Sequence, residues 1–185
     1  MEQEKIRELL YRTDVIRPGH FLRASGRHCN KHVQCAHLFE KAQYAEMICG
    51  QIAERFREEN VQLVLSAAVG GILAGYEVSR QLGARNIYAE RQNNVLTLRR
   101  GFGFAPGTRV LIVEDMISTG RSVRELMEIV RAIGGEVVGV SCILDVSGGK
   151  VAFGKPFYAV YSEEVEMYMQ DACPLCSENK PFDNM

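Results

Sequence analysis

The spacing of apolar residues predicts helices and strands that alternate along most of the chain. In several segments apolar side chains recur every three or four residues, as on the buried face of a helix, and other segments are short apolar runs typical of strands. The predicted helices cover residues 2–13, 39–60, 72–82 and 123–133, and the predicted strands cover residues 61–66, 87–91, 95–100, 109–114, 136–145 and 157–162. This alternation indicates an α/β fold with a mostly parallel central sheet that is flanked by helices on both faces.

The two ends of the chain fit this alternation less well. Residues 20–35 are rich in basic and small residues and lack a helical period, so we expect irregular structure or short strands there. Residues 163–170 are predicted as a short polar helix. We expect one domain, residues 1–185, in which residues 1–38 form a small N-terminal hood, residues 39–162 the α/β core, and residues 163–185 a C-terminal helix and tail.

Composition and charge argue against several classes of protein. The 185 residues include 22 Lys and Arg against 23 Asp and Glu, and 46% are hydrophobic. This balance is not that of a disordered chain or of a protein that coats nucleic acid. The apolar runs are too short for a membrane span, and the segment MEQEKIRELL lacks the apolar core of a signal peptide. We therefore expect a cytoplasmic protein with no membrane or nucleic-acid partner and with reduced cysteines.

The most informative stretch is VLIVEDMISTGRS, residues 110–122. An apolar strand ends in Glu114 and Asp115, and small and hydroxyl residues lead into the next helix, where Ser122 and Glu125 have the spacing of a capping box. Ligands bind beyond the carboxyl ends of parallel strands. Paired carboxylates suit the vicinal hydroxyls of a sugar, or Mg²⁺ bound directly or through water, and a loop before a helix N-terminus suits a phosphate. A ribose phosphate would satisfy both halves of the stretch.

This stretch closely resembles the 5-phosphoribosyl-1-diphosphate (PRPP) binding motif of the type I phosphoribosyltransferases. The resemblance implies their fold, with Glu114 and Asp115 as the catalytic acids that bind the ribose hydroxyls. It also implies Mg²⁺ as the cofactor, held near the same two acids. The loop after the acids would bind the 5′-phosphate, and the earlier loop at residues 67–71 would bind the diphosphate. The PRPP contacts implied in these loops are Ile117, Ser118, Thr119, Gly120, Arg121, Ser122, Ala68, Val69 and Gly70.

The resemblance extends over nearly the whole chain and narrows to the orotate phosphoribosyltransferase family, in particular its short prokaryotic form. The similar segments are Phe21 with Ser25-Gly26, residues 33–36, 69–71, 76–78, 89–91 and 96–102, and the terminal Cys-Pro-Leu-Cys. The resemblance implies transfer of the 5-phosphoribosyl group from PRPP to orotate, which gives orotidine 5′-monophosphate and diphosphate in pyrimidine biosynthesis. It also implies a homodimer, since family members complete the site across a subunit interface.

Three arginines of the predicted hairpin, Arg91, Arg99 and Arg100, are candidates for diphosphate contacts, because forked guanidinium groups match phosphate oxygens. Each of them would otherwise be an ordinary solvated arginine. Arg23 and Arg27 are candidates for the positive charge that an orotate carboxylate needs. The residues that we expect at the base are Phe21, Arg23, Ser25 and Val146.

The chain departs from the family pattern at three places. Ala24 stands where the broader family has a lysine, and the hairpin sequence lacks the family's long mobile loop of lysines and a histidine. Val146 follows Asp145, where an arginine that contacts orotate usually stands. The base is therefore held differently or is a different base. The alternatives are a phosphoribosyltransferase for another nucleobase and a regulator that senses PRPP without catalysis.

Histidines and cysteines gather in two parts of the sequence. The first group, His28, Cys29, His32, Cys35 and His37, fits no standard zinc spacing, and we interpret it as partly buried thiols and surface imidazoles. The tail adds Cys173 and Cys176, which are two ligands where a structural zinc site needs four. Cys29 and Cys35 would be the residues to complete such a site, but we favour free thiols.

Overall fold

A six-stranded sheet forms the centre of the protein, for which a computed structural model describes residues 2–23 and 25–184. Its strand order is β5-β4-β3-β6-β7-β8, and all neighbours are parallel except the β4–β5 hairpin. The strands are β3 (Leu63–Ala67), β4 (Arg85–Gln92), β5 (Val95–Leu98), β6 (Arg109–Ile117), β7 (Glu136–Asp145) and β8 (Phe157–Ser162). The predicted mostly parallel sheet is therefore confirmed.

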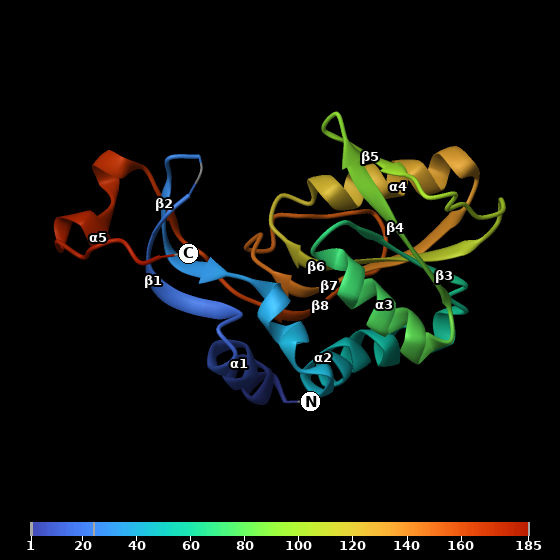
Figure 1. The fold of residues 1–185 in the computed structure, drawn as a ribbon, viewed down its shortest axis with the longest axis horizontal. Coiled ribbons are helices and arrows are strands. Elements are labelled where there is room, and N and C mark those ends of the chain that lie inside the picture. The colour runs from blue at the N-terminus through green and yellow to red at the C-terminus, as the bar shows by residue number, and fades with distance from the viewer. Residues whose placement is uncertain (1, 24, 185) are drawn as a thin grey trace.

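Helices cover both faces of this sheet (Figure 1). One apolar cluster joins the sheet to α1 (Gln3–Arg12), α2 (Ala42–Arg55) and α3 (Gly71–Leu82), and a second joins it to α4 (Arg121–Ile133) on the other face. The buried side chains of each helix recur at three- and four-residue intervals, as the sequence pattern predicts. Within the described residues, no helix is long and apolar enough to cross a membrane.

A separate three-stranded antiparallel sheet lies beside the core (Figure 1). We call this sheet the hood, because two of its strands come from the predicted N-terminal hood and the third comes from the C-terminal segment. It consists of β1 (Ile16–Leu22), β2 (His28–Val33) and β9 (Met167–Tyr168), so short strands do form between residues 20 and 35. Short helical turns follow β2 at Cys35–Glu40 and β9 at Gln170–Ala172, and a third turn lies at Arg57–Glu59. The last helix, α5 (Pro174–Ser177), has a single turn.

The predicted helix over residues 163–170 is wrong. This segment instead forms β9 and a 3-10 turn, because β9 pairs with the edge of β2, where His28 faces Tyr168 and Cys29 faces Met167. A strand partner from the other end of the chain outweighs a weak helical pattern in a polar segment. The C-terminal segment is therefore part of the hood sheet, although more than a hundred residues separate it from β1 and β2.

Candidate functional site

The acidic pair lies at the carboxyl end of β6, between two neighbouring parallel strands. Glu114 is buried and pairs with Cys142 of β7, and Asp115 is half-buried. The loop that follows β3 passes close beside both carboxylates. A Cβ atom built on Gly70 would overlap the Asp115 carboxylate, and one on Gly71 would lie 3.0 Å from Glu114 Oε2. Glycine is therefore required here for the loop to approach the acids.

The surroundings of the acidic pair shift the pKa values of both carboxyl groups. Burial first, and then the neighbouring Asp115 carboxylate, raise the pKa of Glu114 well above its ordinary value. Burial also raises the pKa of Asp115, while hydrogen bonding opposes this shift, with the Met116 N–H donating to Asp115 Oδ1 at 2.8 Å. Among the described residues, Glu114 Oε1 is a buried acceptor without a hydrogen-bond partner. The pair is therefore ready to accept hydroxyl donors or a cation.

The loop between β6 and α4 encloses a cavity of about 160 Å³. Gly120 precedes α4 with φ of +72°, and a Cβ there would lie 2.9 Å from the Phe153 ring, so only glycine makes this turn without strain. The first residues of α4, Arg121 to Val123, line the cavity, and a helix N-terminus of this kind suits a phosphate. The cavity is lined by Glu114, Met116, Ile117, Ser118, Thr119, Gly120, Arg121, Ser122 and Val123.

The predicted capping box at Ser122 and Glu125 is wrong. The helix begins two residues earlier than predicted, at Arg121, with Gly120 as the N-cap residue and no side-chain cap. The Glu125 carboxylate instead accepts the Leu96 N–H at 3.0 Å and the Arg121 Nε–H at 2.7 Å. The bond from Leu96 ties α4 to the β4–β5 hairpin, and this tertiary contact replaces the local cap that the sequence pattern allows.

Of the three hairpin arginines, Arg91 lies nearest to the phosphate loop. Its Nη1 pairs with Glu125 at 3.0 Å, and its Nη2 donates to Ser122 Oγ at 3.4 Å. Its charge also partly opposes the raised pKa of Glu114. Arg100 instead pairs with Glu90 at 2.9 Å, and Arg99 is exposed just beyond the edge strand β5. Arg91 is therefore the hairpin arginine that the fold joins to the acidic pair and the loop.

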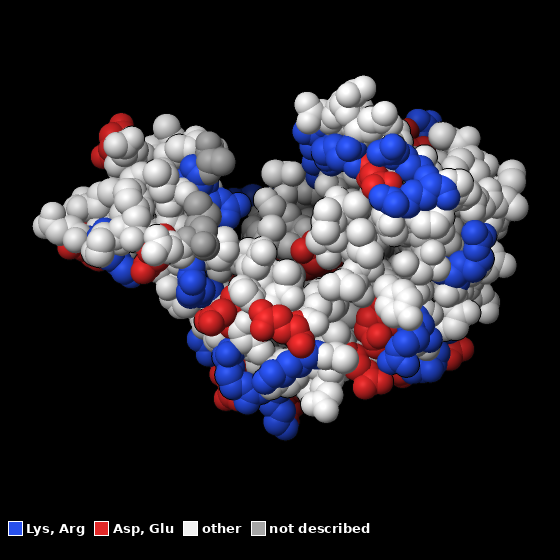
Figure 2. Space-filling model, in the orientation of Figure 1, with Lys and Arg blue, Asp and Glu red and all other residues white. Residues whose placement is uncertain are grey.

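A second cavity, of about 110 Å³, lies where the hood meets the carboxyl ends of β6 and β7. Figure 2 shows the surface hollowed between the hood and the core. Arg23 and Lys31 contribute positive charge to the cavity, and Val146 contributes part of an apolar wall. The other lining residues are Val33, Met116, Ser118, Val165 and Met167. Ser118 belongs to both cavities, so the two spaces are adjacent.

Lys31 was not singled out by the sequence pattern, and the basic composition of residues 20–35 is its only signal. Its side chain pairs with Glu163, and its Nζ donates to the Glu164 carbonyl at 2.8 Å. Burial opposes its charge, but the hydrogen bond and the attraction of Glu163 raise its pKa above the ordinary lysine value. Lys31 is therefore charged at neutral pH and lines the same cavity as Val146.

The other candidate residues lie in different surroundings. Phe21 is fully buried within the hood and packs on the His32 ring, with centroids 5.5 Å apart. Ser25 and Arg27 line another surface depression on the hood. Ala68 precedes Val69 through a cis peptide bond in the loop after β3. Ala24 lies outside the described residues.

Comparison with known proteins agrees with this geometry. The phosphoribosyl transferase domain matches residues 36–171. The orotate phosphoribosyltransferase of Caldanaerobacter subterraneus subsp. tengcongensis is 45% identical over 98% of this chain and 96% of its own length, and that of Thermotoga maritima is 42% identical over 95% and 94%.

Solved structures share the fold at low sequence identity. The crystal structure of orotate phosphoribosyltransferase from Aeropyrum pernix has a TM-score of 0.70 and 20% identity, over 85% of this chain and 93% of that chain. The adenine phosphoribosyltransferase from Thermoanaerobacter pseudethanolicus has a TM-score of 0.71 and 16% identity, over 88% of this chain and 100% of that chain. Together with the close sequence relatives, these matches establish that the chain belongs to the phosphoribosyltransferase family and, within it, to the orotate phosphoribosyltransferases.

Proposed function

We propose that this chain transfers the 5-phosphoribosyl group from PRPP to orotate, giving orotidine 5′-monophosphate and diphosphate in pyrimidine biosynthesis. The observation that carries the proposal is the adjacency of two cavities that share Ser118. The first cavity is lined by Glu114, next to Asp115, and by the loop that suits a phosphate. The second cavity is lined by two basic side chains and by apolar side chains. The names of the close relatives support the same reaction.

The sugar and its phosphate fit the first cavity. Asp115 and Glu114 accept hydrogen bonds from the ribose hydroxyls, and the backbone of residues 117–121 binds the 5′-phosphate at the N-terminus of α4. Breaking the bond between C1 and diphosphate leaves an oxocarbenium-like sugar, so positioning and stabilisation of the leaving group dominate the catalysis. We assign the diphosphate to the loop of Ala68, Val69 and Gly70, which passes beside Asp115, and to the Arg91 guanidinium, which reaches Ser122 at the start of α4.

The acidic pair also fits a divalent cation. Glu114 Oε1 is buried without a hydrogen-bond partner in the described part of the chain, and a nearby positive charge would favour the ionised form of both acids. We therefore propose that Glu114 and Asp115 hold Mg²⁺, directly or through water, when PRPP binds. The ion would neutralise part of the charge of the diphosphate leaving group.

The base fits the second cavity. Orotate is flat, with apolar faces and a carboxylate, so it needs apolar walls and a cation. Val146 and Met116 offer the walls, and Arg23 and Lys31 offer the charge. Arg23, together with Lys31, whose charge is shared with Glu163, would then serve the carboxylate in place of the arginine that usually follows Asp145. Phe21 and Ser25 would then act by shaping the hood rather than by touching the base.

A panel of bases tests the proposal against the alternatives. Diphosphate release is measured with PRPP, Mg²⁺ and either orotate, uracil, adenine, guanine or hypoxanthine, and the Asp115→Asn variant reports contaminating activity. We expect release with orotate and little with the other bases. Release with a different base would identify a transferase for that base. PRPP binding without release for any base would identify a sensor.

We also propose a homodimer. Val69 is 83% exposed, and Leu73 and Tyr76 on α3 are 51% and 57% exposed, so apolar side chains at four- and three-residue intervals form one uncovered face beside the diphosphate loop. A second copy that covers this face would lie close to the site. Light scattering at working concentration should give twice the mass of the chain, and Tyr76→Asp should weaken the dimer. A wild-type monomer would contradict the proposal.

A further inference from the structure

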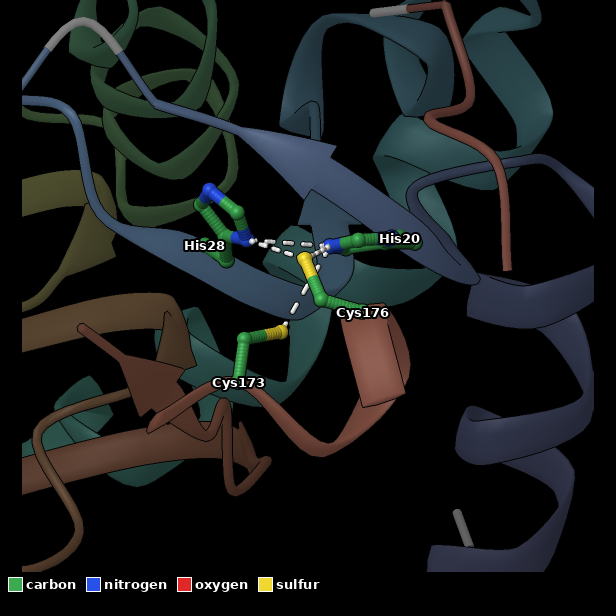
Figure 3. A group of neighbouring side chains, drawn as sticks. All are labelled: His20, His28, Cys173 and Cys176. Carbon is green, nitrogen blue, oxygen red and sulfur yellow. Dashed lines mark hydrogen bonds between the residues drawn. The ribbon is translucent and has the colours of Figure 1, made fainter. Parts of the chain in front are cut away.

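Two histidines of the hood and two cysteines of the tail point toward a common centre (Figure 3). His20 comes from β1, His28 from the start of β2, and Cys173 and Cys176 lie around α5. One nitrogen or sulfur atom of each side chain lies within 4.8 Å of all the others. His20, His28 and Cys173 are almost fully buried, and Cys176 is exposed.

The separations between these atoms match a tetrahedral metal site. His20 Nε2 lies 3.1 Å from His28 Nδ1, 3.5 Å from Cys173 Sγ and 3.8 Å from Cys176 Sγ, and Cys176 Sγ lies 3.3 Å from His28 Nδ1. Zinc bonds of about 2.3 Å to sulfur and 2.0–2.1 Å to nitrogen place tetrahedral ligands about 3.3–3.8 Å apart. Three of these four distances lie within that range, and the His20–His28 distance of 3.1 Å is slightly shorter, so the cluster has about the size of a tetrahedral zinc shell.

The surroundings of His20 fix which of its nitrogens faces this centre. His20 Nδ1 lies 2.8 Å from the Lys180 carbonyl oxygen, so it carries the proton and donates it, which leaves the lone pair of Nε2 toward the cluster. Carbonyl acceptors behind a metal-binding imidazole commonly orient the ring in this way. The Phe182 ring covers both imidazoles, with centroids 4.3 Å and 4.9 Å away, and keeps water from one side.

We propose that His20, His28, Cys173 and Cys176 form a structural zinc site that fastens the C-terminal tail to the hood. Four protein ligands of two sulfurs and two nitrogens complete a tetrahedral shell, which is typical of structural zinc and leaves no position for a substrate. The site uses the Cys-x-x-Cys pair of the tail. Its other two ligands are hood histidines, and Cys29 and Cys35 lie outside the cluster.

The hood needs such a cross-link because it has little apolar core of its own. Along its three strands, the buried hydrophobic side chains are Ile16, Phe21 and Cys29, and Ile16 belongs to the cluster of the α/β core. Small sheets with so few buried side chains are commonly stabilised by a metal or by disulfides. A zinc bound between β1, β2 and the tail would contribute folding energy directly to this part of the protein.

The site would also position the proposed base cavity. His28 faces Tyr168 in the pairing of β2 with β9, and Met167 of β9 lines that cavity together with Lys31 of β2. Zinc would hold β9 against β2 because its cysteine ligands follow β9 in the chain. Loss of zinc should therefore loosen one wall of the cavity while leaving the PRPP loops of the core unchanged.

Elemental analysis of the untagged full-length chain, purified under reducing conditions without chelator, tests the proposal. We expect about one zinc per chain, and at least about a tenfold lower zinc content in Cys176→Ser. The Cys176 side chain is exposed, so this substitution leaves no cavity in the core. Cys35→Ser removes a buried thiol outside the cluster and should keep the full zinc content. Limited proteolysis should cut the segment 170–184 faster in Cys176→Ser than in Cys35→Ser.

Cobalt gives a second, independent measurement. After removal of zinc, the reduced wild-type chain should bind one Co²⁺ with the visible bands of a tetrahedral ion and a thiolate-to-cobalt charge-transfer band. The charge-transfer band should lose intensity in Cys176→Ser, because one of the two thiolates is removed. A reduced chain that binds neither Zn²⁺ nor Co²⁺ would overturn the proposal. Full zinc content in both Cys173→Ser and Cys176→Ser would overturn it as well. So would a Cys173–Cys176 disulfide that persists in protein purified under reducing conditions.

Discussion

Replacement of Asp115 by asparagine should remove transfer activity while leaving the fold intact. Asparagine has the same shape and keeps an oxygen that can accept the Met116 N–H, which Asp115 Oδ1 accepts at 2.8 Å. The substitution removes a charge whose burial is unfavourable, since burial raises the pKa of Asp115. The melting temperature of Asp115→Asn without ligands should therefore equal that of the wild type or exceed it.

The loss of activity follows from the hydrogen bonds that the carboxylate makes. A hydrogen bond to a charged group contributes about 1.5–3 kcal/mol. Loss of one such bond to a ribose hydroxyl would lower the rate about 10- to 150-fold, and loss of two would lower it about 10²- to 10⁴-fold, at about 1.4 kcal/mol per factor of ten. Loss of interactions that strengthen as charge develops on the ribose lowers kcat as well as kcat/KM.

The assay is diphosphate release from PRPP with orotate, together with thermal unfolding of the same samples. Asp14→Asn is a matched control because Asp14 lies in the turn after α1, with a φ of 55° that asparagine also adopts. It should keep wild-type rates. Near-normal turnover of Asp115→Asn with an unchanged KM for PRPP would remove the acidic pair from the mechanism.

Three further predictions concern the two cavities. Val146→Arg should lower the KM for orotate up to about tenfold by adding a cation to the base cavity. Leu22→Arg, at an exposed residue of β1 that does not line this cavity, should leave that KM unchanged, and an unchanged KM in Val146→Arg would place the base elsewhere. Gly70→Ala should raise the KM for PRPP at least about tenfold, because the new methyl group would overlap the Asp115 carboxylate, and calorimetry that finds wild-type PRPP affinity would refute this. Without ligands, stability should fall as pH rises above the ordinary carboxyl range, because the unfolded chain releases the Glu114 proton while the folded chain, with its raised pKa, retains it. Thermal unfolding between about pH 5 and 8 should show this decline in the wild type and a smaller one in Glu114→Gln, and equal slopes would contradict the raised pKa.

The apolar pattern of a segment predicted its structure best where no distant part of the chain decides how that segment is paired or buried. The strands β7 and β8 begin and end where the apolar runs predict. Strand β7 lies inside the parallel sheet and is buried along nearly its whole length, whereas β8 is an edge strand whose residues are mostly half-buried. The same reasoning located the acidic pair and the loop of residues 117–122, since the carboxyl end of a strand is the binding edge of such a sheet. These features need no knowledge of distant contacts.

Prediction failed where a distant segment provides the partner. Residues 163–170 are too polar to reveal that they form the third strand of the hood, because β9 depends on the edge of β2. Glu125 has the spacing of a cap, but it bonds to the hairpin at Leu96. In both cases a tertiary hydrogen bond replaces the local one that the sequence favours.

The sequence by itself determined the α/β core, the order of its helices and strands along the chain, and the residues that we propose to bind the ribose and its phosphate. Only the tertiary structure brought Lys31 into one cavity with Val146, and His20 within 3.5 Å of Cys173, 153 residues away in the chain. The physical reason is that periodicity records how each segment is buried, whereas a cavity or a metal cluster depends on which segments become neighbours. The tail therefore offers two cysteine ligands in the sequence, and only folding brings His20 and His28 of the hood beside them to make the proposed set of four.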